Sequence, residues 1–195
     1  MKKTLLLAGV ASLLAFQANA VEFKPYVGLD YAYTDVSATD QIYGVSDDYY
    51  ETKFNSGVIN AGTKVGDYFG VEAFYQKSGD EKGKHVTVVD AYDRTVAEGK
   101  IKTNFDAYGL DLMGYIPVTD KLEAIASVGA GQYEFEIEGL GYAFNEDGLG
   151  VRGGLGLQYN INDNLAVRGM ARYVYLDMDE VDYLTEFTAG VRYSF

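Results

Sequence analysis

The sequence predicts one all-β domain, an eight-stranded antiparallel up-and-down transmembrane β-barrel. Three observations support this prediction. Apolar and polar residues alternate with a period of two from Phe23 to Phe195, as in β-strands with one apolar face. Short and long connections alternate between the strand segments, as they do in outer-membrane barrels. The composition, with 23 Gly, 18 Tyr and 2 Pro, is typical of β-structure and lacks the proline bias of disordered chains.

Eight segments carry the alternation. Their lengths of roughly 9–11 residues match a strand that crosses a bilayer at a tilt of about 45°. The segments are 23–34, 55–65, 68–76, 104–116, 122–133, 149–159, 165–175 and 186–195.

The first four segments place apolar and aromatic residues on one face and polar or small residues on the other. In segment 104–116, Leu110 and Leu112 alternate with Gly109 and Asp111. The apolar faces of the other three segments contain Phe23, Val27, Leu29, Tyr31, Tyr33, Ile59, Ala61, Val65, Phe69, Val71, Ala73 and Tyr75.

The last four segments repeat this pattern. Segment 122–133 is ambiguous because both of its faces are small or apolar; we assign Leu122 and Val128 to one face, and Glu123 and Gly129 to the other. The remaining apolar faces contain Leu149, Val151, Leu155, Leu157, Tyr159, Leu165, Val167, Ala171, Tyr173, Tyr175, Phe187, Ala189, Val191, Tyr193 and Phe195.

The connections are of two kinds. Those after the second, fourth and sixth segments are short, and Pro117 falls at a strand end because proline cannot donate a ladder hydrogen bond. The others are predicted as long loops over residues 35–55, 78–100, 134–148 and 176–185.

The N-terminus reads as a targeting segment. An apolar run over residues 5–16 follows two lysines and is too short to span a bilayer, which needs about 20 residues. Ala18 and Ala20 give the small-x-small pattern of a signal peptidase site. We therefore expect residues 1–20 to be a cleavable secretory signal peptide and residues 21–195 to be the barrel domain.

The polar faces predict a narrow, charged interior. They hold five acids and five bases, although the whole chain has a net charge of −13. A soluble sandwich or barrel would alternate in the same way, but it would turn large solvated side chains toward water. Glycines and balanced charges instead fit a desolvated lumen in which each charge needs a partner. The predicted lumen charge network is Asp30, Lys64, Glu72, Asp111, Glu123, Arg152, Arg168, Arg172, Glu186 and Arg192.

Aromatic residues gather at both ends of the predicted outer face. Such girdles are expected where rings lie between lipid and headgroup, and without tryptophan tyrosine supplies most of them. One end has Phe23, Phe69, Tyr159, Tyr193 and Phe195, and the other has Tyr31, Tyr33, Tyr75, Tyr108, Tyr173, Tyr175 and Phe187.

The closing segment resembles the β-signal read by the outer-membrane assembly machinery. Its aromatic and apolar positions are Phe187, Ala189, Val191, Tyr193 and Phe195. With phrases such as KPYVGLDYAYT, GVEAFYQ and ARYVYL, the chain from residue 21 to residue 195 resembles the small porin-like outer-membrane β-barrel family, of the OmpA transmembrane, OmpX and opacity-antigen type. The resemblance implies that the assembly machinery, outer-membrane lipid and lipopolysaccharide are partners. We expect the peptidoglycan-binding domain of some relatives to be missing.

No residue pattern predicts an enzyme or a cofactor site. Membrane-barrel enzymes typically rely on a histidine base, and the one histidine is His85 in the long connection 78–100. A general base must be held within hydrogen-bond reach of its substrate, so we interpret His85 as an exposed loop residue. The chain has no cysteine, hence no thiolate metal site, and its acidity argues against nucleic-acid binding.

The four long connections carry most of the acidic charge. Asp177, Asp179, Glu180 and Asp182 offer oxygen ligands but lack the spacing of an EF-hand, so metal binding stays open. Charge that keeps the loops soluble is the plainer interpretation. Such loops would also suit a cationic host or surface partner, or lipopolysaccharide bridged by divalent ions.

These features predict an integral protein of a Gram-negative-type outer membrane, with extracellular loops and periplasmic termini. We expect a non-enzymatic structural or surface-interaction role. Two alternatives remain, a narrow porin-like channel for small solutes or ions, and a host-contact adhesin or surface antigen. Side chains can fill the interior of eight strands, so we expect little or no steady conductance.

Overall fold

The structure is a computed structural model that describes residues 22–38, 41–42, 45–46, 53–79, 81–89, 95–139, 142–177 and 181–195. These residues form strands joined by short turns. The strands are β1 (Phe23–Ala38), β2 (Gln41–Ile42), β3 (Val45–Ser46), β4 (Lys53–Val65), β5 (Phe69–Ser78), β6 (Glu81–Val89), β7 (Thr95–Pro117), β8 (Leu122–Gly139), β9 (Tyr142–Asn160), β10 (Leu165–Leu176) and β11 (Val181–Ser194).

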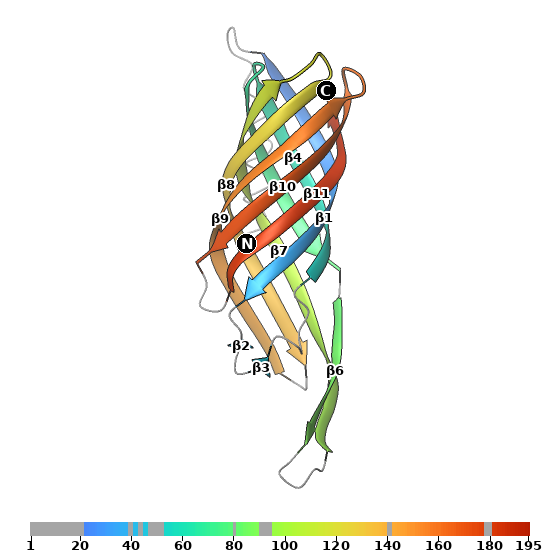
Figure 1. Cartoon of the computed structure of the whole chain (residues 1–195), viewed down its shortest axis with the longest axis vertical. Helices are drawn as coiled ribbons and strands as arrows, with labels where there is room; N and C mark the ends of the chain where they lie inside the picture. Colours follow the sequence, from blue (N-terminus) through green and yellow to red (C-terminus); the bar gives the residue numbers. More distant parts are fainter. Residues whose placement is uncertain are drawn as a thin grey trace.

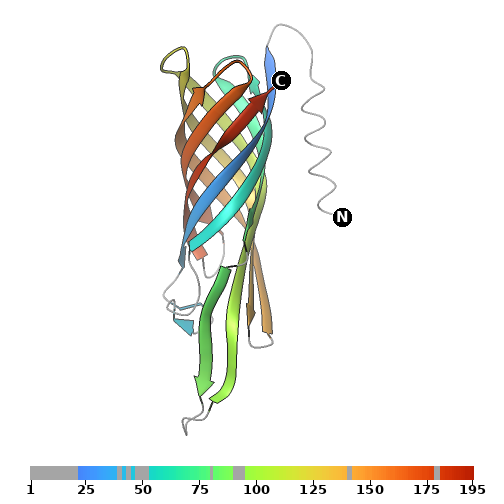
Figure 2. The ribbon, with the colours of Figure 1, turned by 90° about the vertical axis from the view of Figure 1, so that its right-hand side faces the viewer.

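Eight of these strands close into a barrel (Figures 1 and 2). Their order is β5–β4–β1–β11–β10–β9–β8–β7, and β5 also pairs with β7, which completes the ring. Every pairing in the ring is antiparallel between neighbours, with the first strand β1 beside the last strand β11. The predicted eight-stranded up-and-down barrel is therefore confirmed.

Side chains alternate between the interior and the outer wall. In β10, buried and exposed residues alternate along almost the whole strand. Inward Arg168 is 4% exposed, whereas outward Leu155 of the neighbouring β9 is 70% exposed. An apolar outer band over a polar interior suits a barrel surrounded by lipid. No helix in the described ranges is long and apolar enough to cross a membrane.

Tight turns join the strands at one end, which we call the short-turn end. Gly66 has a φ of 61°, a conformation that glycine adopts without steric cost. Pro117 is the last residue of β7, as predicted. Asn162 Oδ1 accepts hydrogen bonds from the backbone N–H groups of Asn164 and Leu165, which fixes the β9–β10 turn. The opposite end is the long-connection end.

Several strands are longer than the sequence predicts. The expected loop 134–148 belongs largely to β8 and β9, and the expected loop 78–100 contains β6 and the start of β7. The expected loop 35–55 contains the end of β1 and the β2–β3 pair. These predictions were wrong because ladder hydrogen bonds persist beyond the apolar band, where both faces of a strand can be polar. The long β6–β7 and β8–β9 hairpins project from the barrel (Figure 2).

Candidate functional site

The barrel interior contains two zones of different chemistry. The ionic network occupies the middle and the short-turn half, where Met113, Tyr115, Ile125 and Met170 also form a small apolar cluster, and a larger apolar cluster occupies the long-connection half. All ten predicted network residues point inward, nine of them buried and Lys64 partly buried. The structure brings every one of them into an ion pair with another member of the set.

Glu72 on β5 is the centre of the largest group. Its Oε2 accepts hydrogen bonds from Arg168 at 2.6 Å, from Arg192 at 2.8 Å and from the Tyr26 hydroxyl at 3.0 Å. Arg192 also donates to the Tyr115 hydroxyl at 2.9 Å and lies 3.8 Å from the centroid of the Tyr26 ring. The group joins strands on several sides of the lumen, so it crosses the interior.

Arg168 extends this group to β1. Its second Nη donates to Asp30 Oδ2 at 2.5 Å, and the same oxygen accepts from the Asn60 side chain at 2.9 Å. Buried charges of this kind cost several kcal/mol each to desolvate unless paired and hydrogen-bonded. The shared acceptors meet that requirement.

Arg152 forms a separate group with Asp111. Both nitrogens Nε and Nη2 donate to the carboxylate in a bidentate arrangement, and the Nε–Oδ1 distance is 2.7 Å. The guanidinium carbon also lies 3.3 Å from the centroid of the Phe74 ring. Arg152 thus contacts both zones.

Two smaller groups complete the network. Arg172 donates to Glu186 at 3.1 Å and to Thr188 at 3.2 Å. Near the short-turn end, Lys64 donates to Glu123 at 2.5 Å, and Gln158 donates to the second Glu123 oxygen at 3.1 Å.

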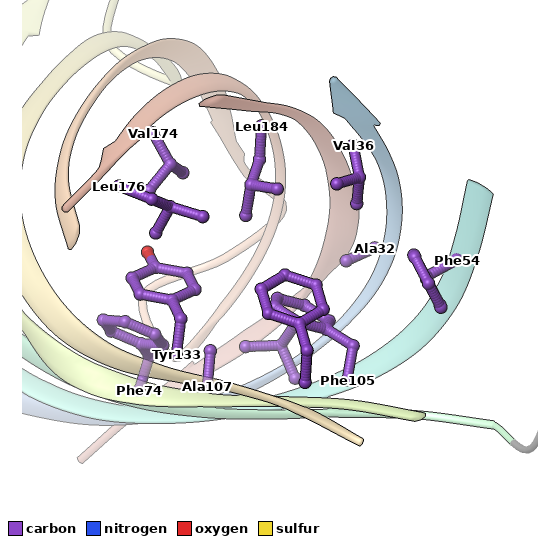
Figure 3. Close-up of a cluster of buried hydrophobic side chains, with 12 residues drawn as sticks. Ala32, Val36, Phe54, Phe74, Phe105, Ala107, Tyr133, Val174, Leu176 and Leu184 are labelled. Atoms are coloured by element: carbon purple, nitrogen blue, oxygen red, sulfur yellow. The ribbon is translucent and has the colours of Figure 1, made fainter. Parts of the chain in front are cut away.

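Sequence reasoning missed the apolar zone. Phe105 lies 6.0 Å from Phe54 and 5.0 Å from Phe135 between ring centroids, and Figure 3 shows the side chains converging inside the barrel. A signal was present in segment 104–116. Phe105 and Ala107 are apolar and lie at odd positions, on either side of polar Asp106, whereas Leu110 and Leu112 lie at even positions. The apolar residues at the two ends of this segment therefore belong to opposite faces of the strand. The cluster comprises Ala32, Val36, Phe54, Val58, Phe74, Phe105, Ala107, Tyr133, Phe135, Val174, Leu176 and Leu184.

A polar vestibule opens at the short-turn end. Its cavity volume is about 650 Å³, and its lining includes Lys24, Lys64, Glu123, Tyr26 and Arg192. Tyr26 and Arg192 belong to the network centred on Glu72, so the vestibule ends at that network.

The outer wall carries aromatic residues near both ends. Phe69 and Tyr193 are exposed near the short turns, and Tyr31, Tyr175 and Phe187 are exposed toward the other end. The predicted girdle members Phe23, Tyr33 and Tyr108 are half-buried.

An acidic row lies just beyond the Tyr75–Tyr108 pair on the outer wall. Strand register places Lys77, Asp106, Glu134 and Asp147 side by side on β5, β7, β8 and β9. A shallow cavity of about 330 Å³ is lined by these four and their neighbours. Across the described ranges, no group of three or more His, Cys, Asp or Glu side chains could hold a metal ion. Much of the predicted acidic loop charge, including Asp40, Asp47, Asp48, Glu51, Asp179 and Glu180, lies outside the described residues.

His85 lies in a strand and not in a loop, which corrects the prediction. It belongs to β6 and pairs with Lys100 of β7. In the described part of the chain β6 pairs with β7 alone and lies outside the eight-strand ring. Hydrogen bonding between the two strands extends β7 past the barrel and turns the expected loop into a hairpin.

The predicted assembly-signal residues lie on the outer wall. Phe187, Ala189, Val191, Tyr193 and Phe195 are all exposed. The Phe195 backbone N–H donates to the Pro25 carbonyl at 3.0 Å, next to the β1–β11 seam. The predicted cleavage residues Ala18 and Ala20 lie outside the described residues.

Comparisons with known proteins agree with the geometry. A family model described as outer membrane protein beta-barrel domain matches residues 4–195. A search of curated proteins gave no match.

Among solved structures, Neisserial surface protein A is similar, with a TM-score of 0.65 and 17% identity over 91% of this chain and 100% of that one. Ail, the attachment invasion locus protein of Yersinia pestis, has a TM-score of 0.60 and 16% identity over 89% and 99%. The outer membrane protein OprG from Pseudomonas aeruginosa has a TM-score of 0.57 and 17% identity over 88% and 96%. Ail has also been solved in complex with the heparin analogue sucrose octasulfate.

Proposed function

The chain belongs to the outer membrane protein beta-barrel domain family, and from this premise we propose that it is a closed, non-enzymatic barrel that serves surface contact and envelope structure. As an outer-membrane protein it has its long-connection end outside the cell. The proposal separates the two roles of the molecule. The barrel anchors the chain in lipid, and the projecting strands meet the surroundings.

The observation that carries the closed-barrel proposal is the filled lumen. The network around Glu72 crosses the interior and ends the periplasmic vestibule. Beyond it, the apolar cluster around Phe105 occupies the extracellular half. A continuous aqueous path would have to pass both zones.

Planar-bilayer recording of the purified, refolded protein tests this proposal. We expect little or no steady conductance. Stable, reproducible open levels from the pure protein would instead support the alternative, a narrow porin-like channel.

The absence of enzymatic chemistry is part of the proposal. The interior carboxylates of Asp30, Glu72 and Asp111 accept hydrogen bonds from arginines, so they are committed to structural pairing. His85 lies on β6, outside the ring that contains them. Incubation with phospholipid, lipopolysaccharide and peptide substrates, with product detection by mass spectrometry, should give no turnover.

A surface-contact role is supported by the strands that project beyond the barrel. β7, β8 and β9 contain 23, 18 and 19 residues, well above the roughly 9–11 needed to cross a bilayer. Trimming these hairpins while keeping the barrel should reduce attachment to a host cell or matrix if the protein is an adhesin. Unchanged attachment would favour a purely structural role.

Lipid and lipopolysaccharide are proposed as neighbours of the apolar outer wall, and the assembly machinery as the reader of the last strand. The residue 1–20 signal peptide is also a proposal. Mass spectrometry of the protein extracted from membranes should give a mature chain that begins at residue 21.

A further inference from the structure

Aromatic side chains cover the outer wall of β10 and β11 near the long-connection end. Tyr173, Tyr175, Tyr183 and Phe187 are between 38% and 59% exposed, and we call these four the tyrosine face. Tyr175 and Tyr183 are direct partners across the two strands, which lie side by side in the barrel wall (Figure 1). The rings of Tyr173 and Tyr183 stack with 5.3 Å between their centroids. The face is therefore one continuous aromatic surface.

The stagger of the strands shows how high this face stands. A path along register partners around the ring begins at Ser78 and returns beside Tyr68, ten residues earlier in the chain; it passes Ser56, Ala32, Thr188, Met170, Gly156, Ile125 and Tyr115. Ten residues over eight strands is an offset of about 1.25 residues per strand, as expected of a tilted barrel. With this offset, Phe187 of β11 lies level with Tyr75 of β5.

Tyr175 and Tyr183 stand above the aromatic level of Tyr75. Tyr183 is four residues beyond Phe187 on β11, and Tyr175 is its partner on β10. At ~3.4 Å per residue and a tilt of about 45°, both rings lie roughly 7–10 Å above that level. A phospholipid headgroup layer is only about 5–8 Å deep, so the two rings reach its outer edge. On the opposite wall, about the same level carries the charged residues Lys77, Asp106 and Glu134.

The tyrosine face offers no charge to a phosphate. Of the residues that the structure describes on β10 and β11, none with an outward side chain is charged. On the neighbouring β1, Asp35 lies opposite Thr185, and Lys53 of β4 lies opposite Asp35. A headgroup phosphate at this face would meet an acid before it met a lysine. The chemistry therefore favours a neutral partner that lies in the headgroup layer and has an apolar surface of its own.

We propose that the tyrosine face binds the sugar rings of an outer-leaflet glycolipid by stacking. The inference rests on the proposal that lipopolysaccharide borders the outer wall, and it names the contact. The C–H groups on one side of a sugar ring are attracted to the electron-rich face of an aromatic ring, while the sugar hydroxyls stay hydrated. The face is continuous with the apolar wall below Phe187, so a ligand anchored in lipid by its acyl chains reaches it directly.

The test titrates the full barrel in detergent micelles with lipids of identical acyl chains, and native mass spectrometry counts the lipids that the barrel retains. Diglucosyl diacylglycerol is the neutral glycolipid probe, phosphatidic acid is the phosphate probe, and phosphatidylcholine is the control without sugar. We expect diglucosyl diacylglycerol to bind about tenfold more tightly than the other two lipids. Free maltose should not bind detectably, because the acyl anchor concentrates the sugar at the wall.

Three double variants locate the contact. Tyr175→Ser/Tyr183→Ser removes both upper rings and should lower glycolipid affinity about tenfold, which is about 1.4 kcal/mol. Tyr175→Phe/Tyr183→Phe keeps the ring faces without their hydroxyls and should bind within about twofold of the wild type. Tyr75→Ser/Tyr108→Ser is the matched control, because these tyrosines are also cross-strand partners but lie lower, on the opposite wall. It should bind like the wild type. All three variants must show the heat-dependent gel shift of a folded barrel.

Five results would overturn the inference: equal wild-type affinity for phosphatidylcholine and the glycolipid, tighter binding of phosphatidic acid, equal losses in the two serine variants, an equal loss in the phenylalanine variant, or maltose binding as tight as glycolipid binding. The first would mean that acyl chains alone cover the face, the second that it is a phosphate site, and the last that its ligand is a soluble saccharide. The conductance and attachment measurements do not depend on this contact, so the proposed function would stand if the contact failed.

Discussion

Arg168 of β10 binds Asp30 of β1 across the barrel interior, with 2.5 Å between Nη2 and Oδ2, although 138 residues separate them in the sequence. The other Nη nitrogen binds Glu72 of β5 at 2.6 Å. One guanidinium thus ties together three strands that are not neighbours in the ring. The side chains involved are almost fully buried, so this relationship is a structural cross-brace of the lumen.

Replacing Arg168 with methionine should strongly destabilise the barrel. The change keeps much of the side-chain volume but leaves Asp30 and Glu72 short of a buried cation, a loss of roughly 3–5 kcal/mol for a broken buried pair. Urea unfolding of the protein refolded in detergent measures this free energy.

The control for this measurement is Lys77→Met. Lys77 and Asp106 form an ion pair whose side chains are 64% and 26% exposed, and such surface pairs contribute about 0–1 kcal/mol. Equal losses in the two variants would show that burial of the network does not govern its contribution.

The Arg152–Asp111 pair should behave as a coupled unit. Arg152→Leu alone leaves a buried carboxylate and should cost roughly 3–5 kcal/mol, whereas adding Asp111→Leu removes the stranded charge and should recover much of that loss. A double-mutant cycle of unfolding free energies measures the coupling. Additive losses would contradict a direct, buried interaction.

Much of this architecture could be predicted from the sequence, and the reasons are physical. Leu110, Asp111 and Leu112 predict a strand with one apolar and one charged side, and in a strand that crosses a bilayer the charged side must face the lumen. The partner of Asp111 could not be predicted. Arg152 lies 41 residues away, and only the closed ring brings the two together.

The apolar half of the lumen escaped prediction because apolar residues there do not distinguish the inside from the outside. Phe105 points inward and Tyr108 outward on the same strand, and both are aromatic. Only the polar Asp106 between them indicates that the apolar residues move from the outer face of the strand to its inner face. The strand extensions escape prediction for a related reason, because beyond the lipid neither face of a strand has to be apolar and the alternation is lost.

Truncating the centre of the apolar cluster should be costly. Phe105 is fully buried and packs against Phe54, Tyr133 and Phe135, so Phe105→Ala should leave a cavity and cost roughly 3–5 kcal/mol. The comparison is Leu155→Ala on the outer wall, where lipid can fill the vacated space. Urea midpoints that fall equally in both variants would indicate that the cluster is not tightly packed.

Gly190 should tolerate no side chain. It lies opposite Asp30 at the β1–β11 seam, and an added Cβ would come closer than 3.0 Å to Asp30 Oδ1 and to the Leu29 carbonyl oxygen. Gly190→Ala should therefore lower stability by about 1–3 kcal/mol through overpacking. Gly57→Ala is the matched control, because a Cβ there meets nothing within 4 Å. If Gly190→Ala left the free energy of unfolding unchanged, the close approach of Asp30 and the Leu29 carbonyl to Gly190 would be contradicted.

Deleting Phe195 should impair assembly in cells more than it impairs folding in detergent. In the folded barrel the Phe195 side chain is exposed, packs edge-on against Tyr193 at 5.3 Å between centroids, and its backbone N–H makes a single hydrogen bond to Pro25. The loss of these contacts should cost only about 1 kcal/mol. If the assembly machinery recognises Phe195, deleting the residue should impair recognition of the last strand before the barrel has closed.

Two measurements on the same variants separate these effects. The fraction of heat-modifiable protein in outer membranes should fall several-fold in the Phe195 deletion, while refolding yield in detergent should stay near that of the wild type. Lys121→Ala in a short turn serves as the control and should leave both values unchanged, since its side chain is exposed. If the fraction of assembled protein and the refolding yield fell together, Phe195 would contribute through stability alone. A recognition defect would instead lower assembly in cells while the purified protein still refolds without the machinery.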